Sequence, residues 1–285
     1  MSAETSLKEG RLDDALAELQ EQVKKEPANP ALRTFLFQLL TVRGDWDRAL
    51  TQLNVAGEMD PLALPMKQTY TEALRCELLR KKVFAGETAP LVFGEPEEWV
   101  ALLIEAAKKA GTGSFEESVT LREKAFEAAP TTTGTINDQP FEWIADADPR
   151  LGPVFEAVVN GRYYWIPAHR IREITIDAPE DLRDMVWAPV EFTWANGGQV
   201  VGLIPTRYPG SEASEDHLIR LSRKTEWYEA APDLWFGLGQ RLIATDAGEF
   251  PLLEIRNIKL DTGLDPAVDA GDEDAAASES EGSDG

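Results

Sequence analysis

The sequence predicts an α+β protein in which an all-α half of repeated helix pairs is followed by a half built around an antiparallel sheet. Three observations support this fold class: a 34-residue internal repeat, a change in composition after Pro130, and an acidic stretch from Asp261 onward. At 285 residues the chain is also longer than a typical single domain. We expect residues 1–135 and 136–260 to form two domains, and residues 261–285, with nine acidic and no basic side chains, to be a disordered tail.

The repeat is clearest in two segments, GRLDDAL from Gly10 and GDWDRAL from Gly44. Six identities recur at the 34-residue spacing: Gly10/Gly44, Asp13/Asp47, Ala15/Ala49, Leu16/Leu50, Leu19/Leu53 and Pro27/Pro61. A third, more divergent copy spans residues 113–130. The pattern resembles the tetratricopeptide repeat, in which a glycine allows the turn between two antiparallel helices and a proline ends the unit. We therefore predict a TPR-like domain, with further helices at Ala31–Val42, Pro65–Phe84 and Glu97–Ala110.

The second half contains short apolar runs separated by turn residues, which is typical of strands. The predicted strands are Tyr163–Ile166, Ile171–Ile176, Val190–Trp194, Val200–Pro205 and Leu252–Ile258. The pair Asn196-Gly197 lies between two of these runs and predicts a hairpin. Short helices are expected at Leu151–Val159, Pro179–Met185 and around Leu234–Leu242.

The composition excludes several classes of function. A net charge of −23 argues against binding nucleic acid or an anionic membrane, because both need a basic surface. The single cysteine, Cys76, lies in an apolar helical stretch, where we expect it to be buried. The first residues lack the features of a signal peptide, and no apolar run is long enough to cross a bilayer, so we expect a cytoplasmic protein.

The residues that usually carry chemistry do not form a recognisable site. His169 and His217 are 48 positions apart and lack a metal-binding context, so we expect no metal and no cofactor. We interpret His169 as a hydrogen-bonded residue at a strand entry and His217 as exposed. The acids in Phe141–Asp148 could do acid/base work, but a turn leading into the helix at Leu151 fits them better.

Three long segments carry a family resemblance: Phe141–Pro167, Leu182–Glu212 and Gly237–Ile258. Together with the helical half they resemble the ImpE/TagJ family of bacterial type VI secretion accessory proteins. The resemblance implies a non-catalytic adaptor that contacts the small subunit of the contractile sheath and links it to the ClpV-type AAA+ ATPase. It implies no catalytic residues, so we expect that the protein is not an enzyme.

Stacked helix pairs expose a groove lined by the first helix of each unit, and such a groove can accept a partner helix. We predict that it takes an amphipathic helix of the small sheath subunit. The predicted lining residues are Thr34, Gln38, Thr41, Leu103, Ala107 and Ala110.

Two other classes of function stay open at this point. The tryptophan-rich second half could bind a small molecule or act as an enzyme, with Arg162, Tyr164 and His169 around a cleft. A deep pocket lined by clustered polar groups would favour that reading. A generic TPR scaffold or chaperone is the other alternative, and it would copurify without sheath proteins.

Overall fold

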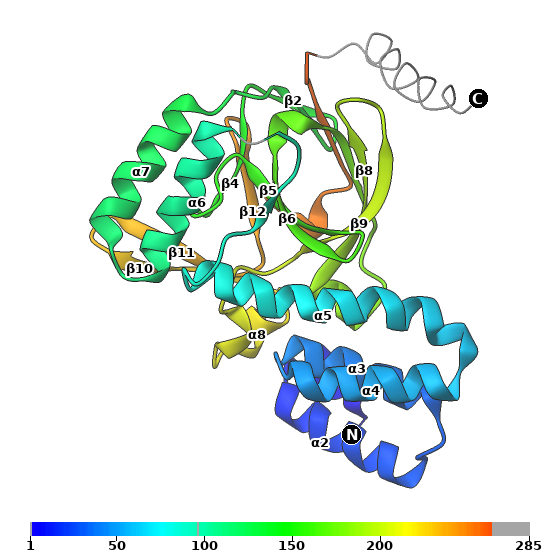
Figure 1. The fold of residues 1–285 in the computed structure, drawn as a ribbon. Coiled ribbons are helices and arrows are strands. Elements are labelled where there is room, and N and C mark those ends of the chain that lie inside the picture. Colours follow the sequence, from blue (N-terminus) through cyan, green and yellow to red (C-terminus); the bar gives the residue numbers. More distant parts are fainter. Residues whose placement is uncertain (1, 96, 264–285) are drawn as a thin grey trace, which may run out of the picture.

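The computed structural model describes residues 2–95 and 97–263, so most of the predicted acidic tail lies outside the described residues. Its helical half has the predicted elements: α1 (Ala3–Lys8), α2 (Leu12–Lys25), α3 (Pro30–Val42), α4 (Trp46–Met59), α5 (Leu64–Phe84), α6 (Glu98–Gly111) and α7 (Phe115–Ala128). Figure 1 shows α5 running along the boundary between the N-terminal helices and the sheet-rich region. Helices α6 and α7 cover one side of that region.

The turns of the predicted repeat are formed by glycines in the left-handed region of backbone space. Gly10, Gly44 and Gly113 have φ angles of 77°, 74° and 81°, values that side-chain-bearing residues rarely adopt. Each lies between two antiparallel helices, as the repeat predicts. The TPR-like interpretation is therefore confirmed for α1–α5, and the divergent third copy forms the helix pair α6–α7 around Gly113.

The small residue five positions after each glycine explains how closely the helices approach. Ala15 and Ala49 are fully buried, and Ser118 in the third copy is 3% exposed. The Ser118 hydroxyl donates to the Ala106 carbonyl of the preceding helix at 2.7 Å. A larger side chain at these positions would push the paired helices apart.

The described residues form three sheets, which are built from residues 134–260 apart from one two-residue strand at Leu91–Val92. The largest has nine strands in the order β1-β6-β5-β9-β8-β7-β14-β2-β3, antiparallel except for the β1–β6 pair. Its strands are β1 (Leu91–Val92), β2 (Gly134–Ile136), β3 (Gln139–Phe141), β5 (Val154–Val159), β6 (Arg162–Pro167), β7 (Ile171–Ile176), β8 (Trp187–Trp194), β9 (Gln199–Pro205) and β14 (Asn257–Leu260). The two smaller sheets are β13-β12-β4 and β10-β11. Their strands are β4 (Ile144–Asp146), β10 (Thr225–Ala231), β11 (Leu234–Gly239), β12 (Leu242–Thr245) and β13 (Gly248–Pro251).

Four of the five predicted strands are confirmed within a few residues, β7 at both ends. The predicted hairpin joins β8 to β9, and Gly197 at its tip has a φ of 86°. The fifth prediction, Leu252–Ile258, is partly wrong. A short 3₁₀ turn at Leu252–Glu254 precedes β14, which begins only at Asn257.

The expected helices of this half are wrong or shortened. Leu151–Val159 contains strand β5, and Leu234–Leu242 contains β11 and the first residue of β12. All six residues of β5 are buried, so the segment has no polar face that would reveal a two-residue period. A continuous apolar run of this kind does not distinguish a buried strand from a buried helix. Pro179–Met185 forms only a 3₁₀ turn, at Leu182–Met185.

The helical half and the sheet share one hydrophobic core. A single cluster of buried residues includes Phe37 and Leu74 from the helices together with Trp165 and Trp187 from the sheet. The expected domain boundary at residue 135 falls just after α7, at the start of β2. Burial of apolar surface therefore continues across this boundary and holds the two halves together.

Candidate functional site

The face of the repeats that turns toward the sheet is filled by the chain itself. We call it the repeat face and define it by Phe37, Thr41 and Tyr70. The Trp187 ring of β8 lies 5.7 Å from the Tyr70 ring and 6.1 Å from the Trp46 ring, measured between centroids. Tyr70 in turn contacts Phe37 at 5.8 Å. The core of the sheet domain thus occupies the place where TPR-like folds offer a groove.

Two arginines from the sheet domain satisfy carbonyl groups at the ends of the repeat helices. The buried Arg207 donates to the carbonyls of Val42 at 2.7 Å and Thr41 at 3.4 Å, at the C-terminus of α3. Arg223 donates to the carbonyl of Leu7, near the end of α1, at 3.0 Å. They lie in the last turns of their helices, where carbonyls lack the usual i+4 donor; Leu7 and Thr41 also accept from the amides of Gly10 and Gly44. Burial lowers the pKa of Arg207 to about 10, so its charge persists at neutral pH and favours the negative end of the helix dipole.

The segment carrying these arginines, residues 206–224, also contacts the turns of both repeats. A Cβ added to Gly44 would lie 2.6 Å from Cγ of Glu212. His217, the first residue of α8 (His217–Arg220), places Nδ1 3.0 Å from the carbonyl oxygen of Gly10. The expectation that His217 is simply exposed is therefore wrong, because a docking contact from a distant part of the sequence was not visible in its local context.

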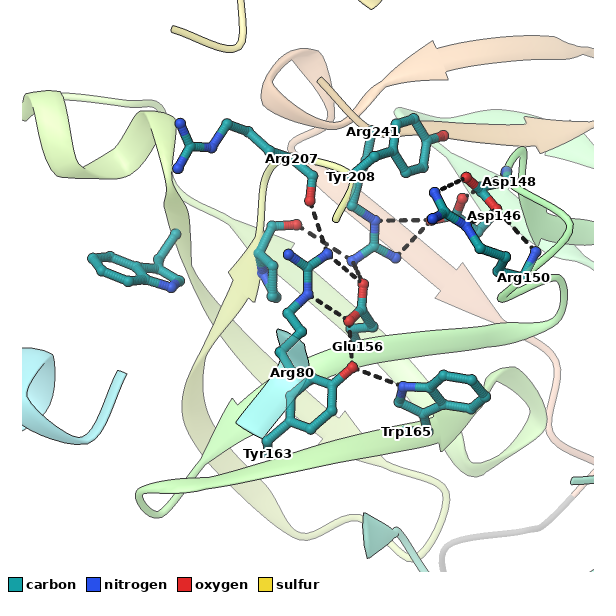
Figure 2. Close-up of polar contacts among 12 residues, drawn as sticks. Arg80, Asp146, Asp148, Arg150, Glu156, Tyr163, Trp165, Arg207, Tyr208 and Arg241 are labelled. Carbon is teal, nitrogen blue, oxygen red and sulfur yellow. Dashed lines mark hydrogen bonds and ion pairs between the residues drawn. The ribbon is translucent and has the colours of Figure 1, made fainter. Parts of the chain in front are cut away.

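A buried network of charged groups continues this junction into the sheet, as Figure 2 shows. Arg80 of α5 donates from Nε and Nη2 to the two carboxylate oxygens of Glu156 in β5, at 2.7 and 2.9 Å. Its Nη2 also donates to the Arg207 carbonyl at 2.8 Å. Arg241 lies 3.2 Å from Glu156 and donates to Asp146 at 2.6 and 2.8 Å. The bidentate geometry fixes the position of α5 on the sheet.

Further polar groups complete the network. The Tyr163 hydroxyl hydrogen-bonds Glu156, and the Trp165 indole donates to that hydroxyl at 2.8 Å. Asp148 accepts from Nε of Arg150 at 2.9 Å and from Nη2 at 2.5 Å. Each of these carboxylates is thus already engaged by an arginine, which suits a structural junction better than acid/base chemistry.

The electrostatics of the network differ between its carboxylates. Burial alone would raise the pKa of Glu156, but the charge of Arg80 and its hydrogen bonds outweigh burial and lower that pKa. Burial raises the pKa of Asp146 to about 6 despite Arg241, and the nearby Asp148 adds to the rise. The turn predicted at these acids is present, but it leads into strand β5 and not into a helix.

The six residues predicted to line the docking groove are mostly inside the protein. Four are buried and two are half-buried: Gln38 is 6% exposed, Thr41 and Leu103 are 0%, Ala107 is 5%, and Thr34 and Ala110 are intermediate. Helix α3 packs against α2, α4 and the Leu182–Met185 turn, whereas α6 packs against α5 and α7. A partner helix would have to displace the chain's own packing to reach these side chains.

An open groove lies elsewhere, between the first half of α5 and strands β5, β8 and β9. We call it the α5 groove; its volume is about 770 Å³. Its apolar surface includes Val158, Val190, Leu203 and the 75% exposed Val201. Its polar lining includes Glu72, Asp177, Arg183 and Glu191. The sequence does not reveal this groove, because its two walls lie more than 80 positions apart and only folding brings them together.

The residues considered for a small-molecule site have separate neighbours. Tyr164 packs edge-on against Phe93 at 6.0 Å, and His169 places Nε2 3.1 Å from Oε1 of Glu97. Arg162 is exposed at the start of β6. The interpretation of His169 as a hydrogen-bonded residue at a strand entry is confirmed, because it lies in the 3₁₀ turn that precedes β7.

Cys76 is buried, as expected, and its thiol lies 3.6 Å from the Gly161 carbonyl oxygen. Burial raises the pKa of this thiol to about 12, so it stays protonated. Within residues 2–95 and 97–263, His, Cys, Asp and Glu side chains do not form a group of three that could hold a metal ion. Over the same residues, the helices are too short or too polar to span a bilayer.

The chain is similar to known proteins over most of its length. The family described as ImpE protein matches residues 138–259, and a tetratricopeptide repeat family matches residues 6–65. The type VI secretion system accessory component TagJ of Pseudomonas aeruginosa is 52% identical over 258 residues, which cover 90% of each chain. The chain belongs to the ImpE/TagJ family. The crystal structure of protein VPA1032 from Vibrio parahaemolyticus has the same fold, with a TM-score of 0.83, 28% identity, and coverage of 92% of this chain and 99% of that one. In this member of the ImpE/TagJ family, the TPR-like and ImpE regions are joined by the junction described above.

Proposed function

We propose that this chain is a non-catalytic, cytoplasmic accessory adaptor of a type VI secretion system. The observation that carries the proposal is the 52% identity to TagJ over nearly the whole of both chains. The geometry supports it, because the buried polar groups are engaged in joining the two halves and an apolar groove remains open beside them. As its partners we propose the small sheath subunit and the ClpV-type AAA+ ATPase, with the adaptor linking the two.

The α5 groove is the place we propose for the sheath subunit. Apolar side chains on its floor suit the apolar face of an amphipathic helix, whose diameter of about 10 Å fits a groove rather than a narrow pocket. The carboxylates of Glu72, Asp177 and Glu191 would favour basic residues flanking that face. The proposed docking surface thus lies between α5 and the sheet, and it differs from the groove predicted from the sequence.

The test is a substitution of the most exposed apolar side chain in the groove, Val201→Glu. The purified variant would be titrated with the small sheath subunit by calorimetry, and we expect affinity to fall at least about tenfold because a charge enters an apolar contact. Leu78→Glu is the matched control, since Leu78 is 48% exposed on α5 outside the groove. Unchanged affinity in the Val201 variant, or equal losses in both variants, would refute this location.

The linking role needs a separate measurement, because binding the sheath subunit does not require the ATPase. We expect the chain, the small sheath subunit and the ClpV-type ATPase to sediment together as one ternary complex. If the sheath subunit and the ATPase displace each other from the chain, the adaptor role is wrong even if each binds alone.

A further inference from the structure

Strand β10 has one paired edge and one open edge. It pairs with β11 from Thr225↔Gly239 to Ala231↔Leu234, with one register shift between Glu229 and Ala231. The far side of β11 is occupied, because the Gly237 amide donates to Asp148 at 2.8 Å and the Gly239 carbonyl accepts from Tyr208 at 2.9 Å. In the described part of the chain, β10 is therefore the outer strand of this two-stranded ribbon.

The register identifies which backbone groups face outward. Gly237 and Gly239 direct their hydrogen bonds away from β10, so Phe236 and Leu238 bond their partners Tyr228 and Glu226. Backbone groups alternate in direction along an antiparallel strand. Up to the register shift after Glu229, the N–H groups at positions 225, 227 and 229 and the C=O groups at 225 and 227 thus point to the open edge.

The other edge strands of the described structure are short, and two of them contain a proline. β3 has three residues including Pro140, β13 has four and ends at Pro251, and β4 and β1 have three and two residues. Short length and proline are common ways to keep an edge from pairing with another chain. β10 has seven residues and contains neither proline nor lysine. It is the edge in the described structure that lacks these protections.

The side chains along β10 indicate the chemistry of an added strand. Glu226 and Glu229 are both exposed, and Lys224, at the start of the strand, already pairs with Glu226. Tyr228 is 42% exposed, and Trp235 on the neighbouring strand is 48% exposed. An extended segment with basic residues would complement the carboxylates and contact the rings. A second copy of this chain would instead bring another net charge of −23 to the edge.

We propose that β10 is a second docking site, which adds one extended, basic segment of a partner protein as an antiparallel strand. Main-chain hydrogen bonds to positions 225, 227 and 229 supply the register, and Glu229 selects for positive charge. This site is on the β10–β11 ribbon and uses none of the residues that line the α5 groove, so it does not depend on the proposed function.

The test uses a blocked, fluorescent peptide of four Lys-Val repeats and its Glu-Val counterpart, with anisotropy measured on the full chain. We expect the Lys-Val peptide to bind at least about tenfold more tightly than the Glu-Val peptide. Glu229→Pro removes one outward N–H while sparing the β10–β11 hydrogen bonds, so affinity should fall about tenfold or more. Glu229→Gln keeps the N–H and should lose about two- to threefold at low salt, and less at high salt.

Hydrogen exchange on the unmodified chain gives a second readout that does not depend on any variant folding. Bound Lys-Val peptide should slow exchange of the amides at Thr225, Trp227 and Glu229 and leave that of Tyr228, which faces β11, nearly unchanged. Equal binding of the two peptides, or the absence of selective slowing, overturns the proposal. A homodimer that Glu229→Pro dissociates in sedimentation would also overturn it, because the edge would then belong to a second copy.

Discussion

The repeat face and the α5 groove are two surfaces of one molecule; the chain itself covers the first and leaves the second open. The repeat face receives Trp187 and Arg207 from the chain's own sheet domain, whereas the α5 groove keeps Val201 three-quarters exposed. Helix α5 contributes to both surfaces: Tyr70 packs against Trp187 and, like Thr69, also lines the groove. The surface that helical repeats usually offer to a partner is used here to hold two halves of one chain together.

The difference follows from which groups each surface leaves unsatisfied. At the repeat face, the end of α3 presents carbonyl groups to the buried Arg207, which donates to them. Removing this donor would leave buried acceptors without it and would cost free energy. A partner would have to replace those hydrogen bonds as well as the aromatic packing. The α5 groove offers mainly apolar surface that a partner can cover without breaking anything.

The largest expected effect comes from breaking the junction at Arg80→Met. Glu156 would keep its contact with Arg241 and its hydrogen bond from Tyr163, but it would lose its bidentate partner while remaining buried. We expect the free energy of unfolding to fall by about 3–5 kcal/mol, measured by urea denaturation. Arg75→Met is the control, because the Arg75–Glu72 pair is exposed and should contribute less than about 0.5 kcal/mol. Similar losses in the two variants would mean that the buried pair does not hold α5 in place.

The next effect concerns the capped end of α3. Arg207→Met leaves the carbonyls of Thr41 and Val42 without this donor, and we expect a loss of about 2 kcal/mol. Amide exchange within α3 should accelerate more than exchange within α7, which Arg207 does not contact. If stability falls but both helices exchange equally faster, Arg207 supports the whole fold and not the repeat face in particular.

The glycines of the repeat turns offer a matched pair. Gly44→Ala and Gly113→Ala both place a side chain at positive φ, at a cost of about 1 kcal/mol each. At Gly44 the new Cβ would also meet Glu212 of the 206–224 segment, whereas around Gly113 nothing lies within 4 Å. We expect Gly44→Ala to cost about 1 kcal/mol more than Gly113→Ala in thermal or urea unfolding. Equal losses of unfolding free energy in the two variants would show that Glu212 moves away from the new Cβ at no measurable energetic cost.

The smallest effect is the pH dependence due to Asp146. Because its pKa is raised to about 6 in the folded state, protonation favours folding. The stabilisation is complete below the unfolded value of about 3.9 and is lost as pH rises through about 6. Between pH 7 and pH 5 the native chain should therefore gain about 1 kcal/mol relative to Asp146→Asn, measured by urea unfolding at both pH values. Parallel pH profiles for the two proteins would contradict the raised pKa.

The sequence was sufficient for the helical repeats because their signals are local. A glycine repeated after 34 residues predicts a helix–helix turn, and a small residue five positions later predicts close helix packing. Gly10 and Gly44 have positive φ, and Ala15 and Ala49 are buried. The α+β class and the hairpin at Asn196-Gly197 followed for the same reason. Strand β5 was mistaken for a helix because burial on both faces removes the period that distinguishes the two.

The functional surfaces were much harder to predict because they depend on contacts between distant segments. The partners of Arg80 and Arg207 lie 76 and up to 166 positions away in the chain. No local pattern reveals that α3, which carries Gln38 and Thr41, will pack against the Leu182–Met185 turn more than 100 residues later. Grooves and buried ion pairs become visible only when the topology is known.

Cys76 gives the molecule one practical property. Because this is the only cysteine in the sequence and its thiol is buried and protonated, it should resist maleimide reagents that modify exposed thiols. A cysteine placed by Val201→Cys or Glu229→Cys would then be the sole reactive position, with the native thiol left in place. Fluorescent probes could thus report separately on the occupancy of the groove and of the open strand edge within a working secretion apparatus.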